Sequence, residues 1–189
     1  CRFDTVAAGE RALIDMWCRP DAVLISDYDK GAMSVDFINK VVKVCAYFGV
    51  PCVADAKREP AVYSGAIIKG NGAYVDQYCH ILPFNTVMTY GANIPVPCDV
   101  DANLPPVSCL NHVGAGDCFA AHLTLALAYG FSLKEAAAIA HSAGRVYVQY
   151  LHNRPPRPEE IRADAESWYN SGILARLESE DICSANPLP

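Results

Sequence analysis

From Asp21 to Ser26 the chain reads Asp-Ala-Val-Leu-Ile-Ser, a short apolar run bounded by polar residues. A run of this kind is typical of a buried strand in a parallel sheet. Two more such runs follow at residues 50–54 and 66–69, and the stretch between the first two has one apolar face that predicts a helix from its cap Ser34 to about Tyr47. Strands that alternate with helices predict an α/β fold with a mostly parallel sheet.

Helical patterns also occur towards both ends of the chain, around a proline-rich middle. Apolar spacing predicts helices over residues 7–18, 115–129 and 159–170, and a further helix that begins after Ser132 and reaches about Leu151. Ser132 and Glu135 have the spacing of a capping box. Residues 86–89 and 94–97 are candidates for strands that the neighbouring prolines confine to an edge or a turn.

The composition indicates one folded domain. The 189 residues are 52% hydrophobic and carry a formal net charge of −6. We place the domain at residues 1–170 and expect a loose polar tail over residues 171–189. An acidic chain without a basic run argues against nucleic acid or an anionic membrane as a partner. No apolar run approaches the roughly 20 residues that a membrane span needs.

The nine cysteines form no C-x-x-C pair and have no histidine pair beside them. Together with the lack of a basic-then-apolar leader, this predicts reduced thiols in a cytoplasmic protein and no metal-binding site formed by cysteine and histidine. The first residue is Cys1 rather than Met, which suggests a processed product or a piece of a longer protein.

The strongest chemical signal runs from Asn111 to Ala121 and reads Asn-His-Val-Gly-Ala-Gly-Asp-Cys-Phe-Ala-Ala. Gly114, Ala115 and Gly116 form a small-residue turn that opens a long helix, so their N–H groups can bind an anion. Asp117 stands beside that anion, where a carboxylate is useful if it takes a proton from a hydroxyl that attacks a phosphate. The alternative is that Asp117 only complements the helix dipole and that the glycines allow tight packing.

This segment resembles the D-T-x-G-A-G-D signature of the ribokinase/PfkB carbohydrate kinase family. Three upstream segments, at residues 25–32, 54–57 and 69–71, resemble the S-D-Y-x-K-G, D-P-K and T-P-N elements of one branch of this family. That branch is the heptose-7-phosphate kinases, which act in ADP-heptose synthesis for lipopolysaccharide precursors. Arg2-Phe-Asp4 also fits the segment that precedes these three, so the resemblance covers roughly residues 2–165, in order. It implies a three-layer ribokinase-like fold whose N-terminal strands and lid are missing.

The resemblance also implies roles for individual residues, with ATP and Mg²⁺ as cofactors. Asp117 would be the general base, and Gly114, Ala115 and Gly116 the anion hole. The residues on the nucleotide side would be Asn71, Thr89, Gly91 and His141. Substrate would be bound by Asp27, Lys30, Asp55 and Lys57, the lysines neutralising phosphate.

Other readings of these residues remain open. Asp27 and Asp29 are also the residues of an ordinary turn. Lys57 and Arg58 are also compatible with a solvated loop pair, and a histidine such as His141 on an alanine-rich helix is more often structural than a ligand contact.

Four features depart from the family pattern. The N-terminal half is absent, and Tyr74 stands where the family has an acidic residue three positions after the asparagine. Asn111-His112 replaces the Asp-Thr of the signature, and residues 74–110 are short and rich in proline. Because missing strands would expose apolar surface, we expect the chain to pair with a copy of itself or with a separate N-terminal half.

The predicted function is ATP-dependent phosphorylation of a hydroxyl on a sugar or sugar phosphate. The absence of G-x-x-x-x-G-K-[ST] argues against a P-loop mechanism. The alternative is a non-catalytic nucleotide-binding or sugar-phosphate-binding remnant of the same scaffold.

Overall fold

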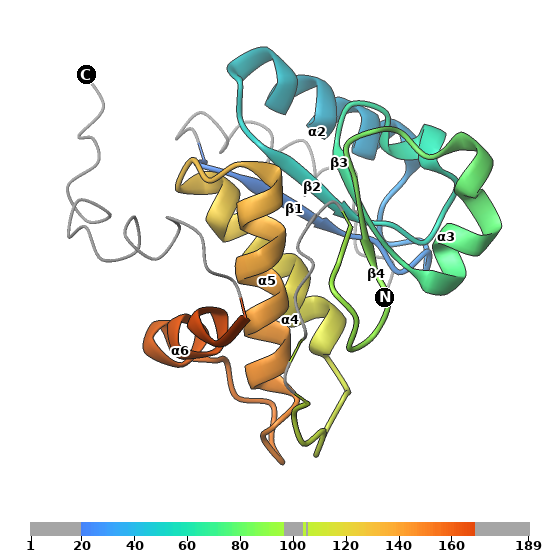
Figure 1. Ribbon diagram of the computed structural model, residues 1–189. Coiled ribbons are helices and arrows are strands. Elements are labelled where there is room, and N and C mark those ends of the chain that lie inside the picture. Colours follow the sequence, from blue (N-terminus) through green and yellow to red (C-terminus); the bar gives the residue numbers. More distant parts are fainter. Residues whose placement is uncertain (1–19, 97–103, 105, 169–189) are drawn as a thin grey trace, which may run out of the picture.

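The computed structural model describes residues 20–96, 104 and 106–168 (Figure 1). Four strands form one sheet in the order β1-β2-β3-β4, and every neighbouring pair is parallel. Their bounds are Val23–Ser26 for β1, Cys52–Asp55 for β2, Ile67–Asn71 for β3 and Thr86–Thr89 for β4. The predicted parallel sheet is thus confirmed. The helix expected at residues 7–18, the Arg2-Phe-Asp4 segment and the tail at 171–189 lie outside the described residues.

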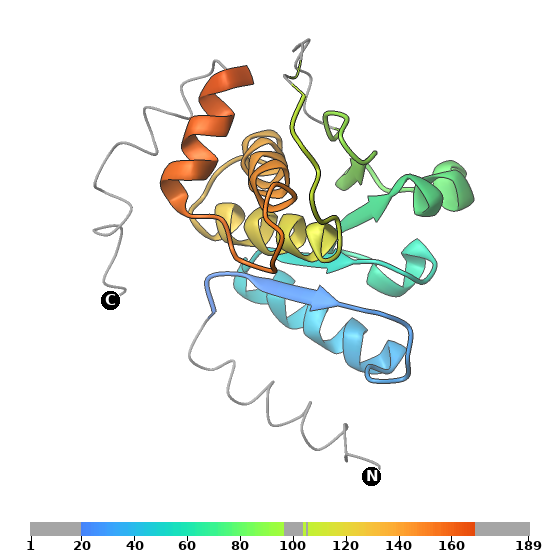
Figure 2. The same ribbon diagram turned by 90° about the horizontal axis from the view of Figure 1, so that it is seen from below.

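Helices cover both faces of the sheet, which gives three layers (Figure 2). Helix α2 (Val35–Phe48) lies on one face. On the other face α4 (Ala115–Ala128) packs on β1 and β2, α5 (Leu133–Tyr147) packs on α4, and α6 (Pro158–Trp168) packs on α5. This arrangement confirms the predicted α/β class and the three layers that the resemblance implies. Within the described residues no helix is long and apolar enough to cross a membrane.

Side chains that alternate along the strands build two apolar cores. Val53 and Val87 point to α4 and α5, where they meet Phe119 and Leu123. Ala54 and Ile68 point to the other face, and their core also holds the following residues of α2: Ile38, Val41, Val42 and Cys45. Since both faces are buried, the strands read as continuous apolar runs, which is why their sequence signal is clear.

The helix ends follow the expected capping chemistry. Ser34 accepts a hydrogen bond from the Phe37 N–H, and Gly49 ends α2 in the left-handed conformation with φ of 68°. Ser132 and Glu135 form the predicted capping box at the start of α5. Helix α5 ends at Tyr147 rather than near Leu151.

The middle of the chain differs most from expectation. Of the two candidate strands, residues 86–89 form β4 at an edge of the described sheet, whereas residues 94–96 contribute one antiparallel bridge, between Met88 and Val96. Two short elements were not predicted: the 3-10 helix η2 (Pro60–Tyr63) and helix α3 (Gly72–Tyr78), with a further 3-10 turn η3 at Cys79–Ile81. Helices this short have too few turns to show an apolar period.

Gly70 on β3 makes room for the ring of Tyr74 on α3. A Cβ at Gly70 would lie 2.6 Å from Tyr74 Cδ1, and Tyr74 is buried. We expect Gly70→Ala to lower the free energy of unfolding by about 1–3 kcal/mol because the ring has no space to move into. Urea denaturation followed by circular dichroism measures this.

The matched control is Gly144→Ala inside α5, where a Cβ would meet nothing within 4 Å. It should raise the free energy of unfolding by about 0.4–1 kcal/mol. A Gly70→Ala variant as stable as the wild type would contradict the packing of Tyr74.

Candidate active site

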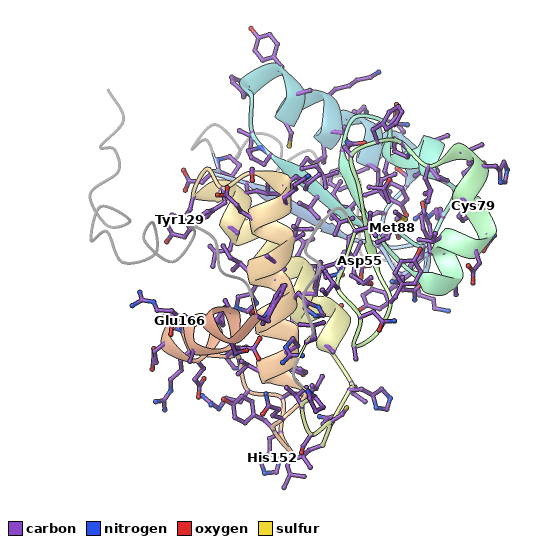
Figure 3. The ribbon with its side chains drawn as sticks, in the orientation of Figure 1. Asp55, Cys79, Met88, Tyr129, His152 and Glu166 are labelled. Carbon is purple, nitrogen blue, oxygen red and sulfur yellow. The ribbon has the colours of Figure 1, made fainter. Side chains whose placement is uncertain are left out.

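The carboxyl ends of three strands and the start of α4 surround one cavity of about 780 Å³. Asp55, Asn71 and Thr89 are the last residues of β2, β3 and β4, so parallel pairing brings them to the same edge. Asp55 lies near the middle of the molecule, whereas His152 and Cys79 lie at its periphery (Figure 3). The cavity is lined by ten of the predicted site residues: Asp55, Lys57, Asn71, Thr89, Gly91, Gly114, Ala115, Gly116, Asp117 and His141.

The start of α4 presents bare backbone to the cavity. Gly114 is the N-cap, with φ of 86°, and a Cβ there would lie 2.6 Å from the Tyr147 hydroxyl. That hydroxyl donates a hydrogen bond to the Val113 carbonyl at 2.9 Å. Glycine is therefore required at residue 114 by backbone conformation and by space. The N–H groups at this helix start carry the positive end of the dipole of a 14-residue helix.

Asp117 is exposed to the cavity in the first turn of α4. Its Oδ1 accepts a 2.6 Å hydrogen bond from the hydroxyl of Tyr28, which lies in the loop after β1. This bond, more than burial, raises the pKa of the Tyr28 phenol above its ordinary value. The carboxylate thus already accepts a hydrogen bond from an alcohol-like group, which is the geometry that a general base needs.

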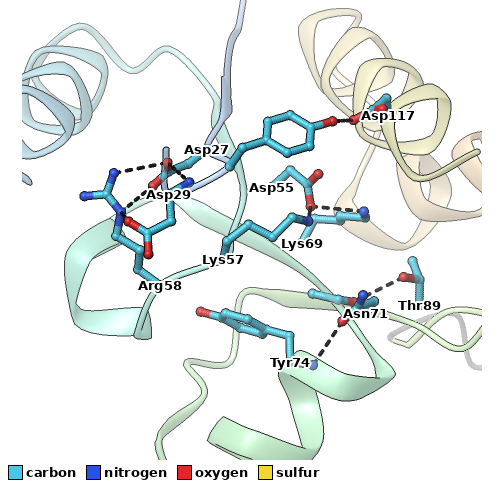
Figure 4. A network of polar contacts seen from close by, with 12 residues as sticks. Asp27, Asp29, Asp55, Lys57, Arg58, Lys69, Asn71, Tyr74, Thr89 and Asp117 are labelled. Atoms are coloured by element: carbon cyan, nitrogen blue, oxygen red, sulfur yellow. Dashed lines mark hydrogen bonds and ion pairs between the residues drawn. The ribbon is translucent and has the colours of Figure 1, made fainter. Parts of the chain in front are cut away.

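Asp55 is a buried carboxylate shared by two lysines (Figure 4). Its Oδ1 lies 3.1 Å from the Lys69 Nζ and 3.2 Å from the Lys57 Nζ. The Lys69 side chain is 5% exposed and the Lys57 side chain 37%. The three groups carry one net positive charge, and Lys69 Nζ lies 3.2 Å from the place that a Cβ on Gly116 would take. Lys69 therefore faces the turn at the start of α4.

Asp27 and Lys30 do not line the cavity. Asp27 is buried and accepts hydrogen bonds from the Tyr63 hydroxyl at 2.8 Å and from Arg58 at 3.1 Å. The Asp29 N–H also donates to Asp27, at 2.9 Å, and Arg58 pairs with Asp29 as well (Figure 4). This arrangement matches the alternative in which the two aspartates shape a turn, and it gives no support to substrate binding by Asp27. Lys30 is exposed on the same loop.

The four residues that the resemblance places on the nucleotide side differ in the contacts that they make. Asn71 caps α3 by accepting a hydrogen bond from the Tyr74 N–H at 3.0 Å, and the Thr89 hydroxyl donates to the Gly70 carbonyl at 3.2 Å. Gly91 takes the left-handed conformation with φ of 62°. His141 is buried against Trp168, lines the cavity and has no hydrogen-bond partner at Nε2. A buried nitrogen without a partner at a cavity wall is a candidate contact for a ligand.

The cavity does not fit a magnesium site held by protein carboxylates. Tyr74, at the position of the expected acidic residue, packs in the core under α2 and lies outside the cavity lining. Asp76 is exposed and outside it too. The carboxylates among the lining residues are Asp55, which two ammonium groups already neutralise, and Asp117. No cluster of three or more potential metal ligands occurs within residues 20–96 and 106–168.

Two polar residues of the cavity wall that contact predicted site residues, Lys69 and Tyr28, carry no role in the sequence-based assignment. Lys69 and Tyr28 both belong to quoted motifs, yet their partners lie 14 and 89 residues away in the chain. A lysine within a run of strand residues is the one sequence signal for Lys69, because a charged side chain in a doubly covered sheet requires a partner. Nothing in the sequence indicates the contact between Tyr28 and Asp117.

Comparison with known proteins finds a family similarity in one part of the cavity wall. The sequence pattern of the pfkB family carbohydrate kinases matches residues 100–160, which include the turn at Gly114 and Asp117. The bifunctional protein HldE of Methylobacillus flagellatus is 23% identical over 195 residues, 90% of this chain and 39% of its own length. The segment that contains Asp117 is thus similar to the pfkB family carbohydrate kinases.

Solved structures support the same fold at low sequence identity. Phosphofructokinase-2 of Escherichia coli, solved in complex with potassium, superposes with a TM-score of 0.64 at 18% identity, over 92% of this chain and 62% of that one. Ribokinase of Arabidopsis thaliana, solved with ribose and ATP, gives 0.60 at 15% identity, over 81% and 58%. The chain therefore spans about two fifths of the HldE relative and about three fifths of these pfkB-type folds. The similarity to HldE agrees with the heptose-7-phosphate kinase branch that the motifs indicate.

Burial lowers the pKa of His141 to about 4, and the charge of Arg145 acts in the same direction. In the unfolded chain a histidine has a pKa of about 6.5, so the unfolded state takes up a proton between these values while the folded state does not. The folded protein should therefore lose about 2 kcal/mol of stability through His141 between pH 7.5 and pH 5. Urea denaturation at the two pH values measures the loss.

His141→Gln should remove this part of the pH dependence, whereas His152→Gln, at an exposed residue, should leave it unchanged. Equal pH dependence in the wild type and in His141→Gln would contradict a neutral, buried His141.

Proposed function

We propose that this cavity transfers the γ-phosphoryl group of ATP to a hydroxyl of a sugar or sugar phosphate. One observation carries the proposal: the Asp117 carboxylate, the bare N-terminus of α4 and the buried ammonium of Lys69 all face the same cavity. The relation to the pfkB carbohydrate kinases supports it. Positive groups next to a single free carboxylate suit a reaction in which a phosphate is held while a neighbouring hydroxyl loses its proton.

The chemical step uses groups that the cavity contains. The acceptor hydroxyl oxygen attacks the γ-phosphorus, the bond from that phosphorus to the β–γ bridging oxygen breaks, and ADP leaves with the electron pair. The proton of the hydroxyl passes to Asp117. The Gly116 N–H group and the Lys69 ammonium stabilise the negative charge on the transferred group, whereas the Ala115 N–H already donates to the His112 carbonyl at 3.2 Å.

The cavity has distinct regions for the two substrates. Asn71, Thr89 and Gly91 line it on the β3 and β4 side, and His141 lies on α5, so we place the nucleotide there. Tyr28 and Lys57 line the side nearer β1 and β2, where we place the acceptor. The partly exposed ammonium of Lys57 favours an acceptor that already carries phosphate. Heptose 7-phosphate, the acceptor of the branch that the sequence resembles, is the first to test.

Asp117→Asn tests the proposal directly. The amide keeps the size of the side chain and accepts a hydrogen bond from Tyr28, but it cannot take a proton. We expect phosphorylation of the acceptor to fall by about 10²–10⁴-fold, the range of general-base catalysis, while nucleotide binding does not weaken and thermal unfolding changes little. A coupled ADP-release assay with product detection by mass spectrometry measures the rate.

Asp76→Asn is the matched control because Asp76 is exposed and does not line the cavity, and its rate should equal that of the wild type. Wild-type turnover in Asp117→Asn would refute Asp117 as the base. A wild-type chain that binds ATP but transfers no phosphoryl group would instead support the non-catalytic alternative.

A further inference from the structure

Two sources of positive charge meet at the start of α4, beside the Asp117 carboxylate: the helix dipole and the Lys69 ammonium. Lys69 Nζ faces the Gly116 turn, where the helix dipole is already positive, so the two repel each other. Asp55 offsets part of this charge but divides its Oδ1 between Lys69 and Lys57. A buried ammonium that shares its carboxylate partner with a second lysine is stabilised further by an anion bound beside it.

The segment that contains Lys69 has no metal-binding carboxylate at residue 74, where the family has an acidic residue. Lys69, Gly70 and Asn71 replace the T-P-N element, and Tyr74 follows at the end of the same turn. The Tyr74 ring packs against Tyr78 at 4.8 Å between ring centroids, and it fits only because Gly70 has no side chain. Residue 74 is thereby committed to the core, with its hydroxyl buried and unpartnered. The positive charge at this end of the cavity comes from Lys69 and not from an ion held through residue 74.

We propose that the Lys69 ammonium, held by Asp55, binds the polyphosphate of ATP at the start of α4 without a metal ion anchored by a protein carboxylate. The identity of the anion rests on the proposed function, whereas the charge arrangement does not. Lys69 touches the bound phosphate, and Asp55 acts through Lys69 by fixing its position and reducing its charge. Removing the charge of Lys69 should therefore weaken anion binding, and removing the charge of Asp55 should strengthen it.

The experiment measures binding of ATP and of inorganic triphosphate to the purified chain by isothermal titration calorimetry, in EDTA and in Mg²⁺. Wild-type protein should bind both in EDTA, with ATP within about tenfold of its affinity in Mg²⁺. Lys69→Met should weaken binding in EDTA at least tenfold, as expected for loss of a charge-assisted contact. Lys43→Met, which removes an exposed lysine on α2, should bind like the wild type.

Asp55→Asn is a second test of the role of Lys69, which does not depend on whether Lys69→Met folds. With the carboxylate neutralised, Lys69 has its full charge for the ligand, so Asp55→Asn should bind triphosphate in EDTA more tightly than the wild type. Its melting temperature should also rise more on adding triphosphate, because the ligand then supplies the missing counter-charge. Binding that needs Mg²⁺ in the wild type, or that is equal in the wild type and both variants, would overturn the role of Lys69.

The outcomes separate this proposal from the kinase function. Phosphoryl transfer that depends on Asp117, without triphosphate binding in EDTA, would leave the kinase function standing and refute the role of Lys69. Lys69-dependent triphosphate binding without any phosphoryl transfer would support the role of Lys69 and refute the kinase function.

Discussion

The ion pair between Lys69 and Asp55 depends on the register of the sheet, and the site depends on that pair. Asp55 on β2 and Lys69 on β3 are direct partners in the parallel ladder. Because successive side chains point to opposite faces, this register puts both groups on the α4 side and leaves Ile68 in the core under α2. A slip of one residue would drive the ammonium into that core and remove the charge from the Gly116 turn. Fold and site therefore impose the same constraint on β3.

A second network fixes the opposite wall of the cavity. Arg58 donates to the Met33 carbonyl at 2.8 Å and pairs with Asp27 and Asp29, so the loop after β1 is held at both of its ends. Tyr28 lies between these two aspartates and reaches Asp117 from there. Within the segment at residues 25–32, Tyr28 reaches the cavity, whereas Asp27 is buried away from it and holds the loop in place.

Features that depend on near neighbours in the chain could be predicted from the sequence, whereas contacts between distant segments could not. The strands, the capping box at Ser132 and the turn before Asp117 all follow from neighbours within a few residues, so sequence reasoning finds them. The shared carboxylate of Asp55 and the contact from Tyr28 join distant segments, and no local period encodes them. Helix α3 was missed for the opposite reason, because its seven residues are too few to show a period.

The proposed reaction needs both the negative charge of Asp117 and the positive charge of Lys69 at the start of α4. Asp117 would repel an incoming phosphate if it faced it alone, since both groups are negative at neutral pH. In the proposed reaction Lys69, whose Nζ faces Gly116 in the same turn, attracts that phosphate together with the positive end of the helix dipole. The phosphate can then approach a carboxylate that remains free to take a proton. Without the ammonium, the acid would work against binding. Without Asp117, Lys69 would still hold the phosphate, but no group would take the proton from the attacking hydroxyl.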